Sequence, residues 1–257
     1  EKSKILAEKF FPTVCPGELP RANAATNAVP ISIEITEEDV NKAIQETAPW
    51  KAPGSDGLPT GYLKMCGKPL MTVLARLYNT TLRLGHWPSP FRRARVVVLP
   101  KPGKTQEQLR FAGGWRPIAL LSCLGKPLEK IMARRILDGA GLAGILPDEQ
   151  FGNRPQRSTE AAVKLVVHSI RTAWKAKGKA SLLQLDLAGA FDRLHHGWLL
   201  AVLTEAGFAP ELVRWLGGWL ENRSAEMLVD GVATDVLISA GVPQGSPMSP
   251  ALFLLFL

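Results

Sequence analysis

Cysteine is scarce in this sequence, and its three cysteines exclude two kinds of covalent or metal-bound scaffold. Cys15, Cys66 and Cys123 lie far apart, and no two of them form a C-x-x-C pair. A disulfide framework needs paired cysteines and a zinc site needs closely spaced ones, so neither is predicted. Free thiols are typical of a reducing compartment, and we therefore expect an intracellular protein of the cytoplasm or the nucleus.

Long apolar runs are also missing. The longest uninterrupted one, residues 251–257, is far shorter than the ~20 residues that a membrane-spanning helix needs, and no signal peptide is visible. We therefore expect no membrane partner.

Histidine offers no metal site either, because the neighbouring His195 and His196 would face different directions; we interpret both as surface groups.

Acidic residues are outnumbered by basic ones. The 257 residues include 31 Lys and Arg against 23 Asp and Glu, which gives a formal charge of +8 and a pI near 9.6. Such an excess favours a polyanionic partner, either nucleic acid or an anionic membrane surface. The basic residues are spread along the chain, however, so the same charge is equally well explained by solubility alone.

Local patterns predict helices joined by Pro/Gly-rich loops. Residues 11–30 carry several prolines and little periodicity, as a linker does. Capping residues and apolar spacing mark the helices. They are predicted from Thr36 to before Pro49, at about 70–84, from Pro127 into the glycines 139–144, from Ser158 or Thr159 to Gly178, at about 197–206 and 210–221, and from a Ser249 cap with Pro250 in the first turn.

Three segments read as strands. Ala94 to Leu99 is predicted to be a buried strand, and residues 227–232 a hairpin that turns at Asp230-Gly231. In residues 181–187 the alternate leucines share one face, so Asp186 projects from the other. A carboxylate at the end of a strand is well placed for chemistry.

Five segments stand out along the chain. In order they are WKAPGSDGLP, RVVVLPKPGK, WRPIALLSCLGKPLEKIMARRI, LDLAGAFD and GVPQGSPMSP, and with FGNRPQRST they span residues 50–250. Each is weak alone, but the ordered set is specific: it resembles the reverse-transcriptase domain of non-LTR (LINE-type) retrotransposons. The resemblance implies an α+β right-hand polymerase fragment with fingers and an incomplete palm, divided into an N-terminal arm or linker (1–40), a fingers-like region (41–180) and a partial palm (181–257).

The resemblance assigns the chemistry mainly to Asp186. In the family pattern D-x-x-x-A-F-D the first Asp binds both metal ions, and the backbone after it, here Leu187, helps to hold the incoming triphosphate. Nucleotide transfer uses carboxylates that hold two Mg²⁺ (or Mn²⁺) ions about 3.5 to 4 Å apart. Without the motif, a strand-end Asp more commonly caps the next turn.

Phe191 falls where the family places a bulky steric gate, whose ring collides with the 2′-hydroxyl of a ribonucleotide and so favours dNTPs. Its alternative role is an ordinary core Phe. Asp192, the second Asp of the pattern, is less clearly a metal ligand, since a salt bridge or a helix cap is the commoner role. Gln244 and Gly245 match the P-Q-G loop, which lies against the nucleotide; a plain turn is the alternative.

Basic residues in the fingers-like region match those that grip the triphosphate, namely Lys101 or Lys104 and Arg116. The loops that resemble template-contacting segments contribute Lys51, Arg154 and Arg157. Solvated loop charge is the alternative role for all of them. The implied partners are an RNA template, a DNA primer and dNTPs.

The third family signature, an aromatic-x-Asp-Asp hairpin, is not found, because no Asp follows Asp235. Residue 1 is Glu and residue 257 lies in an apolar pattern, so we expect both ends to be cut and these residues alone to be inactive. The main prediction is an RNA-directed DNA polymerase fragment. The alternatives are a catalytically incomplete nucleic-acid-binding remnant, an RNA-dependent RNA polymerase, which should lack a bulky residue at position 191, and a group II intron maturase.

Overall fold

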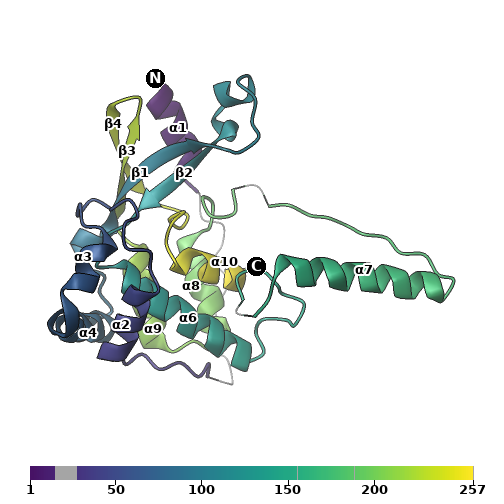
Figure 1. The fold of residues 1–257 in the computed structure, drawn as a ribbon, viewed down its shortest axis with the longest axis horizontal. Helices are drawn as coiled ribbons and strands as arrows, with labels where there is room; N and C mark the ends of the chain where they lie inside the picture. Colours follow the sequence, from purple (N-terminus) through teal and green to yellow (C-terminus); the bar gives the residue numbers. More distant parts are fainter. Residues whose placement is uncertain (15–27, 155, 188, 257) are drawn as a thin grey trace.

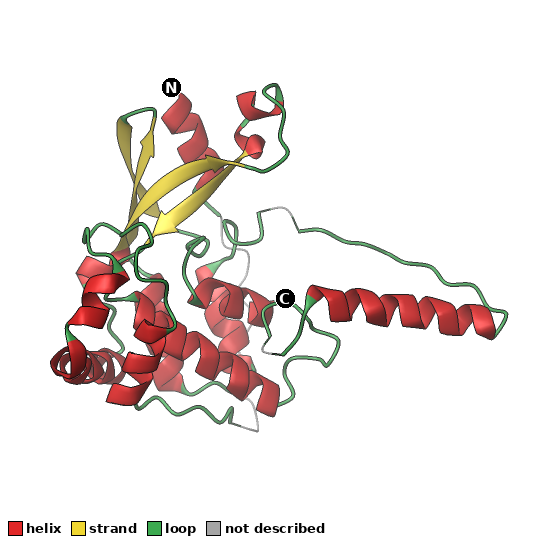
Figure 2. Ribbon diagram, viewed as in Figure 1, coloured by secondary structure: helices red, strands yellow, loops and turns green. Residues whose placement is uncertain are grey.

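The computed structural model describes residues 1–14, 28–154, 156–187 and 189–256, and it shows an α+β architecture in which a sheet stands over a body of helices (Figures 1 and 2). The helices are α1 (Lys2–Phe10), α2 (Glu37–Gln45), α3 (Thr60–Met65), α4 (Gly67–Leu84), α5 (Ser89–Arg92), α6 (Lys126–Leu142), α7 (Thr159–Lys175), α8 (His196–Glu205), α9 (Pro210–Leu220) and α10 (Met248–Phe256). The strands are β1 (Arg93–Pro100), β2 (Trp115–Leu120), β3 (Arg223–Val229) and β4 (Val232–Ile238).

The sheet is mixed, with the strand order β2-β1-β3-β4. Strands β1 and β3 run parallel, and the outer pairs β1/β2 and β3/β4 are antiparallel. The predicted hairpin turn is confirmed: Asp230 and Gly231 have φ angles of 51° and 81°, the left-handed pair that a tight two-residue turn requires. Strand β1 is confirmed as a strand, but only Ala94 and Val96 are buried, because just one face is covered.

The predicted division at residue 180 cuts through this sheet. Strands β1 and β2 come from the fingers-like region and β3 and β4 from the predicted palm, and Val96 faces Met227 across the parallel pair. The two regions therefore share one backbone hydrogen-bond network.

Helix α1 covers one face of the sheet. Its apolar side, Leu6, Ala7 and Phe10, is buried against β-strand residues in a small core. At its start the Lys2 ammonium lies 2.8 Å from the Asp230 carboxylate. The region predicted as an N-terminal arm or linker thus begins with a helix, which docks because packing its apolar face on the sheet removes that face from water. Residues 15–27 of the predicted linker lie outside the described residues.

A larger core is built from the helices below the sheet. Buried side chains of α2, α4, α6, α8, α9 and α10 form one continuous cluster, in which Trp87 and Trp215 meet edge to face with 5.6 Å between ring centroids. The expected helices are confirmed, including the one whose first turn holds Pro127. Among the described helices, none is both long and apolar enough to cross a bilayer.

Helix α10 begins earlier in the chain than expected. It starts at Met248, so Ser249 lies inside it and donates a hydrogen bond to the Pro243 carbonyl (2.8 Å), while the Ser246 hydroxyl accepts from the Met248 N–H (3.0 Å). Leu252 and Leu255 of this helix are buried in the helical core, since α6 and α8 cover this face.

Helix α7 and the segment after it project from the body (Figures 1 and 2). Ser158 caps α7 as predicted, by accepting from the Ala161 N–H (3.1 Å), but no residue of the helix is buried. The predicted strand at 181–187 is wrong: these residues belong to no strand, and Leu183 and Leu185 are 81% and 85% exposed. Alternation alone cannot make a strand, because no described segment pairs with its backbone.

The start of α2 allows a test of local stability. Thr36 accepts from the Asp39 N–H (3.1 Å), and Asp39 accepts from the Thr36 N–H (2.9 Å), which completes the predicted capping box. Thr36→Ala should lower the free energy of unfolding by about 1 kcal/mol in urea titrations, because the Asp39 N–H in the first turn of the helix loses its acceptor, the Thr36 hydroxyl. Ser169→Ala in exposed α7 is the control, and an equal loss there would contradict the assignment.

Candidate active site

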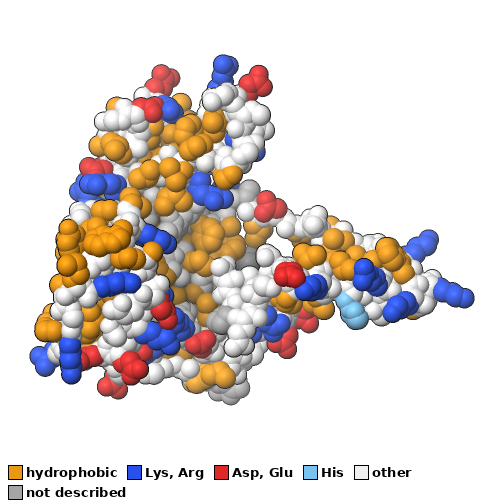
Figure 3. Space-filling view, viewed as in Figure 1, with side chains coloured by type: hydrophobic (Ala, Val, Ile, Leu, Met, Phe, Trp, Pro, Cys, Tyr) orange, Lys and Arg blue, Asp and Glu red, His pale blue; other side chains and the backbone are white. Residues whose placement is uncertain are grey.

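Most of the predicted site residues line one cleft of about 600 Å³ between the sheet and the helical body. Figure 3 shows this face of the molecule hollowed, with hydrophobic side chains in the hollow and basic ones beside it. The predicted residues in the cleft wall are Lys101, Arg116, Asp186, Leu187, Phe191 and Gln244. The structure thus brings together residues from the β1–β2 loop, the start of β2, the 186–193 segment and the loop before α10.

Four basic side chains line this cleft: Lys9, Lys101, Arg116 and Arg193. Lys101 is held at the end of β1, where its ammonium donates to the Gly113 carbonyl (2.9 Å) and its backbone N–H to that of Gly114 (2.8 Å). Cations gathered in a cleft concentrate positive potential there. The cleft therefore suits an anion with several charges, such as a polyphosphate.

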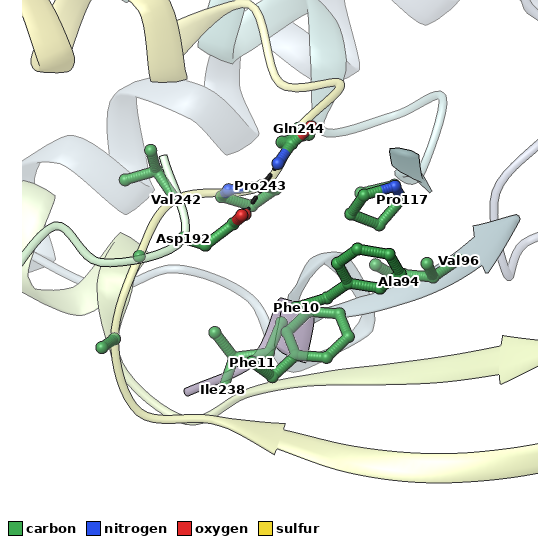
Figure 4. A pocket seen from close by; sticks show the side chains of 13 residues that line it. Phe10, Phe11, Ala94, Val96, Pro117, Asp192, Ile238, Val242, Pro243 and Gln244 are labelled. Carbon is green, nitrogen blue, oxygen red and sulfur yellow. Dashed lines mark hydrogen bonds between the residues drawn. The ribbon is translucent and has the colours of Figure 1, made fainter. Parts of the chain in front are cut away.

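The same cleft holds two carboxylates in different surroundings. Asp186 is exposed, whereas Asp192 is half-buried and accepts a hydrogen bond from the Gln244 side-chain amide (2.7 Å; Figure 4). Burial raises the pKa of Asp192 above its ordinary value, although the bond from Gln244 opposes the shift. Asp192 therefore acts as a hydrogen-bond partner for the P-Q-G loop.

The carboxylates in the described ranges do not by themselves make a metal centre, because no group of three or more His, Cys, Asp or Glu side chains clusters there. Asp186 is exposed in the cleft and so accessible to an ion, but one oxygen of Asp192 is already occupied by Gln244.

The Phe191 ring has two neighbourhoods. One side lines the cleft, and the ring packs on Phe253 of α10 with 5.2 Å between centroids. Phe191 therefore lies between the cleft and the helical core, and its role as a steric gate stays a prediction.

The P-Q-G loop is fastened to β2. The Ala119 N–H donates to the Gln244 carbonyl (2.7 Å), and Gly245 has a φ of 139°. A Cβ on Gly245 would lie 2.3 Å from the Ala119 oxygen, so a larger residue cannot replace it without moving the backbone. The close approach predicted for Gly245 is present, but its neighbour is strand β2, and Gly245 does not line the cleft.

Four other predicted residues lie outside the cleft wall. Arg154 donates to the Pro147 carbonyl (2.6 Å), and Arg157 pairs with Asp148 (3.4 Å). Lys51 and Lys104 are exposed on separate loops. The structure therefore does not join them to the candidate site.

Several contributors were missed by sequence reasoning. Arg193 directly follows the D-x-x-x-A-F-D pattern and could have been noticed there, but Lys9 carried no signal, since only the docking of α1 brings it to the cleft. Phe10 and Phe11 line a separate small cavity of about 30 Å³, whose wall also contains Asp192 and Gln244 (Figure 4).

The neighbouring histidines were expected to be surface groups, and this is wrong. His195 caps α8 by accepting from the Trp198 N–H (3.2 Å), and the Nε2 of His196 lies 2.7 Å from the Gly241 carbonyl. Burial lowers the pKa of His196. Both are half-buried because the segment after Asp192 folds back onto the loop before α10.

Comparison with known proteins agrees with the sequence pattern. The profile of the family described as "Reverse transcriptase (RNA-dependent DNA polymerase)" matches residues 99–257. The chain is 33% identical over 223 residues to the RNA-directed DNA polymerase from mobile element jockey of Drosophila funebris. The aligned region covers 86% of this chain and 24% of that protein.

Two transposon proteins of Drosophila melanogaster are similar as well. The probable RNA-directed DNA polymerase from transposon BS is 33% identical (86% of this chain, 24% of that protein), and the one from transposon X-element is 30% identical (87% and 26%). The chain therefore spans about a quarter of the length of these relatives.

The surroundings of Asp192 predict a pH-dependent stability. A carboxyl whose folded pKa is raised costs stability when it ionises, so Asp192→Asn should raise the free energy of unfolding above that raised pKa. The gain should vanish as the pH falls toward the ordinary value of 3.8, where wild-type Asp192 is protonated too. Urea titrations from pH 4 to pH 8 measure this difference. The exposed Asp148→Asn is the control, and a gain independent of pH would contradict the assignment.

Proposed function

Because the chain belongs to the reverse transcriptase (RNA-dependent DNA polymerase) family, we propose that the cleft is where a protein containing it adds dNTPs to a DNA primer on an RNA template. One observation carries this proposal: residues picked from four separate sequence segments line a single cleft. The relatives are named as RNA-directed DNA polymerases, two of them as probable ones, which supports the same kind of reaction here.

The basic side chains of the cleft are proposed to bind the triphosphate of the incoming dNTP. Lys101 supplies a compact ammonium, and Arg116 a planar fork that can donate two hydrogen bonds to one phosphate. Lys9 and Arg193 line the same cleft and add to its positive potential. The backbone at Leu187, also in the wall, would lie beside the phosphates.

Phe191 is proposed as the steric gate. Its ring lines the cleft and is backed by Phe253, so it cannot retreat freely when a 2′-hydroxyl approaches. Gln244, held toward Asp192, would contact the nascent base pair.

Asp186 is proposed to hold divalent metal, Mg²⁺ or Mn²⁺, which in this family supplies charge stabilisation for nucleotide transfer. Its exposed carboxylate in the cleft supports that role. We also propose that residues 41–180 correspond to fingers and 181–257 to part of a palm, with the shared sheet as their junction. Template contacts by Lys51, Arg154 and Arg157 remain a prediction.

The proposed role of Asp186 is tested by primer extension with a protein that contains the whole chain. Asp186→Asn removes a charge but little volume, and it should lower dNTP incorporation on an RNA template by at least ~100-fold. Asp235→Asn, on exposed β4, is the matched control and should stay within about twofold. If the unmodified protein binds primer–template but never extends it, the binding-remnant alternative replaces the polymerase.

The gate predicts a change in sugar selectivity. Phe191→Ala opens space for a 2′-hydroxyl, so the preference for dNTP over NTP should fall roughly tenfold or more in single-nucleotide incorporation assays. Phe111→Ala, at an exposed position outside the cleft wall, should leave the preference unchanged. An unaltered preference in Phe191→Ala would remove Phe191 from the proposed site.

A further inference from the structure

A buried carboxylate lies under the P-Q-G loop. Glu129 of α6 is 1% exposed and does not line the cleft. Both of its oxygens are used: Oε1 accepts from the Trp219 indole N–H (2.9 Å), and Oε2 accepts from the Ser246 hydroxyl (2.7 Å). One side chain therefore ties α6 and α9 to the loop that carries Gln244.

The surroundings of Glu129 compensate a buried negative charge. Arg223, at the start of β3, is also 1% exposed; it stacks 4.7 Å from the Trp219 ring and donates to the Trp219 carbonyl (3.0 Å). Burial raises the pKa of Glu129, and the positive charge of Arg223 opposes this. Within the described part of the chain, the Nε and Nη2 atoms of Arg223 have no hydrogen-bond partner. Glu129 and Arg223 both contact Trp219 without forming a direct ion pair. Two buried charges, one of them with unused donors, are costly for stability, so folding alone explains them poorly.

Ser246 transmits the position of Glu129 to Gln244. Its N–H donates to the Pro243 carbonyl (3.1 Å), which closes the turn that contains Gln244. Its hydroxyl accepts from the Met248 N–H (3.0 Å) while it donates to Glu129. Two hydrogen bonds therefore fix this turn: the one from the Ser246 hydroxyl to Glu129 and the one from the Ala119 N–H to the Gln244 carbonyl. With the turn fixed in this way, the Gln244 side chain lies in the cleft wall.

We propose that Glu129 is a positioning residue for Gln244, which it holds at the cleft through Ser246. This inference rests on the proposed polymerase function, because the position of Gln244 affects activity only if the cleft binds a nucleotide. Glu129 itself touches no substrate.

A double-mutant cycle tests the coupling. Glu129→Gln keeps the volume but presents an amide NH₂ to one of two donors, so it should lower kcat/KM for dNTP incorporation roughly tenfold. In a Gln244→Ala background the same change should cost less than about twofold, because the positioned group is already gone. An equal factor in both backgrounds would overturn the proposal and leave Glu129 with a purely structural role. Thr81→Val, another buried hydrogen-bonding side chain, is the control and should not change kcat/KM.

Hydrogen exchange on the 257-residue chain provides a readout that is independent of activity. Glu129→Gln and Ser246→Ala should both speed exchange of the Met248 and Ala119 amides, whose acceptors lie in the loop, while α4 amides keep their rates. A uniform increase across the chain would overturn the positioning role. If a longer protein that contains the whole chain fails to extend primers but the local exchange effect is found, the polymerase proposal fails and the loop linkage stands.

Discussion

The backbone bond from the Ala119 N–H to the Gln244 carbonyl is the contact on which the cleft depends. It joins the edge of β2 to the loop that enters α10, and the close approach of Gly245 to Ala119 leaves no room for another register. The Val242 N–H donates to the Phe191 carbonyl (2.8 Å) and the Gly241 N–H to that of Leu194 (2.7 Å), so the D-x-x-x-A-F-D segment is fastened to the same loop. Strand β2, the loop before α10 and the D-x-x-x-A-F-D segment are therefore joined by backbone hydrogen bonds.

Two apolar cores support this unit from different sides. The smaller one lies between α1 and the sheet, and the larger one fills the helical body. A polar cluster connects α6, α9, β3 and the P-Q-G loop; its members are Glu129, Trp219, Arg223 and Ser246. Apolar side chains in the same place would make no directional contacts. Hydrogen bonds to a buried carboxylate restrict geometry more strongly than apolar packing does, which is why this cluster can orient a loop.

Much of the fold was predictable because its signals are local. Capping at Thr36 and Ser158, Pro127 in a first turn and the Asp230-Gly231 turn are set by a few neighbouring residues, and all four are confirmed. The expected strand at 181–187 failed, since a strand depends on a distant partner that its own alternation does not reveal. The packing of α1 on the sheet and of α10 on α6 and α8 likewise joins residues far apart in the sequence.

The sequence by itself determined the family, through ordered motifs, and most residues of the candidate site, because chemistry restricts which residue types can occupy those positions. Only the tertiary structure decided that Lys9 and Arg193 join the cleft, that Gly245 faces β2, and that Lys51, Arg154 and Arg157 stand apart. It alone revealed Glu129 beneath the loop. A motif indicates which chemistry a residue can perform. Which residues from distant parts of the sequence become its neighbours depends on packing, and no local pattern encodes that packing.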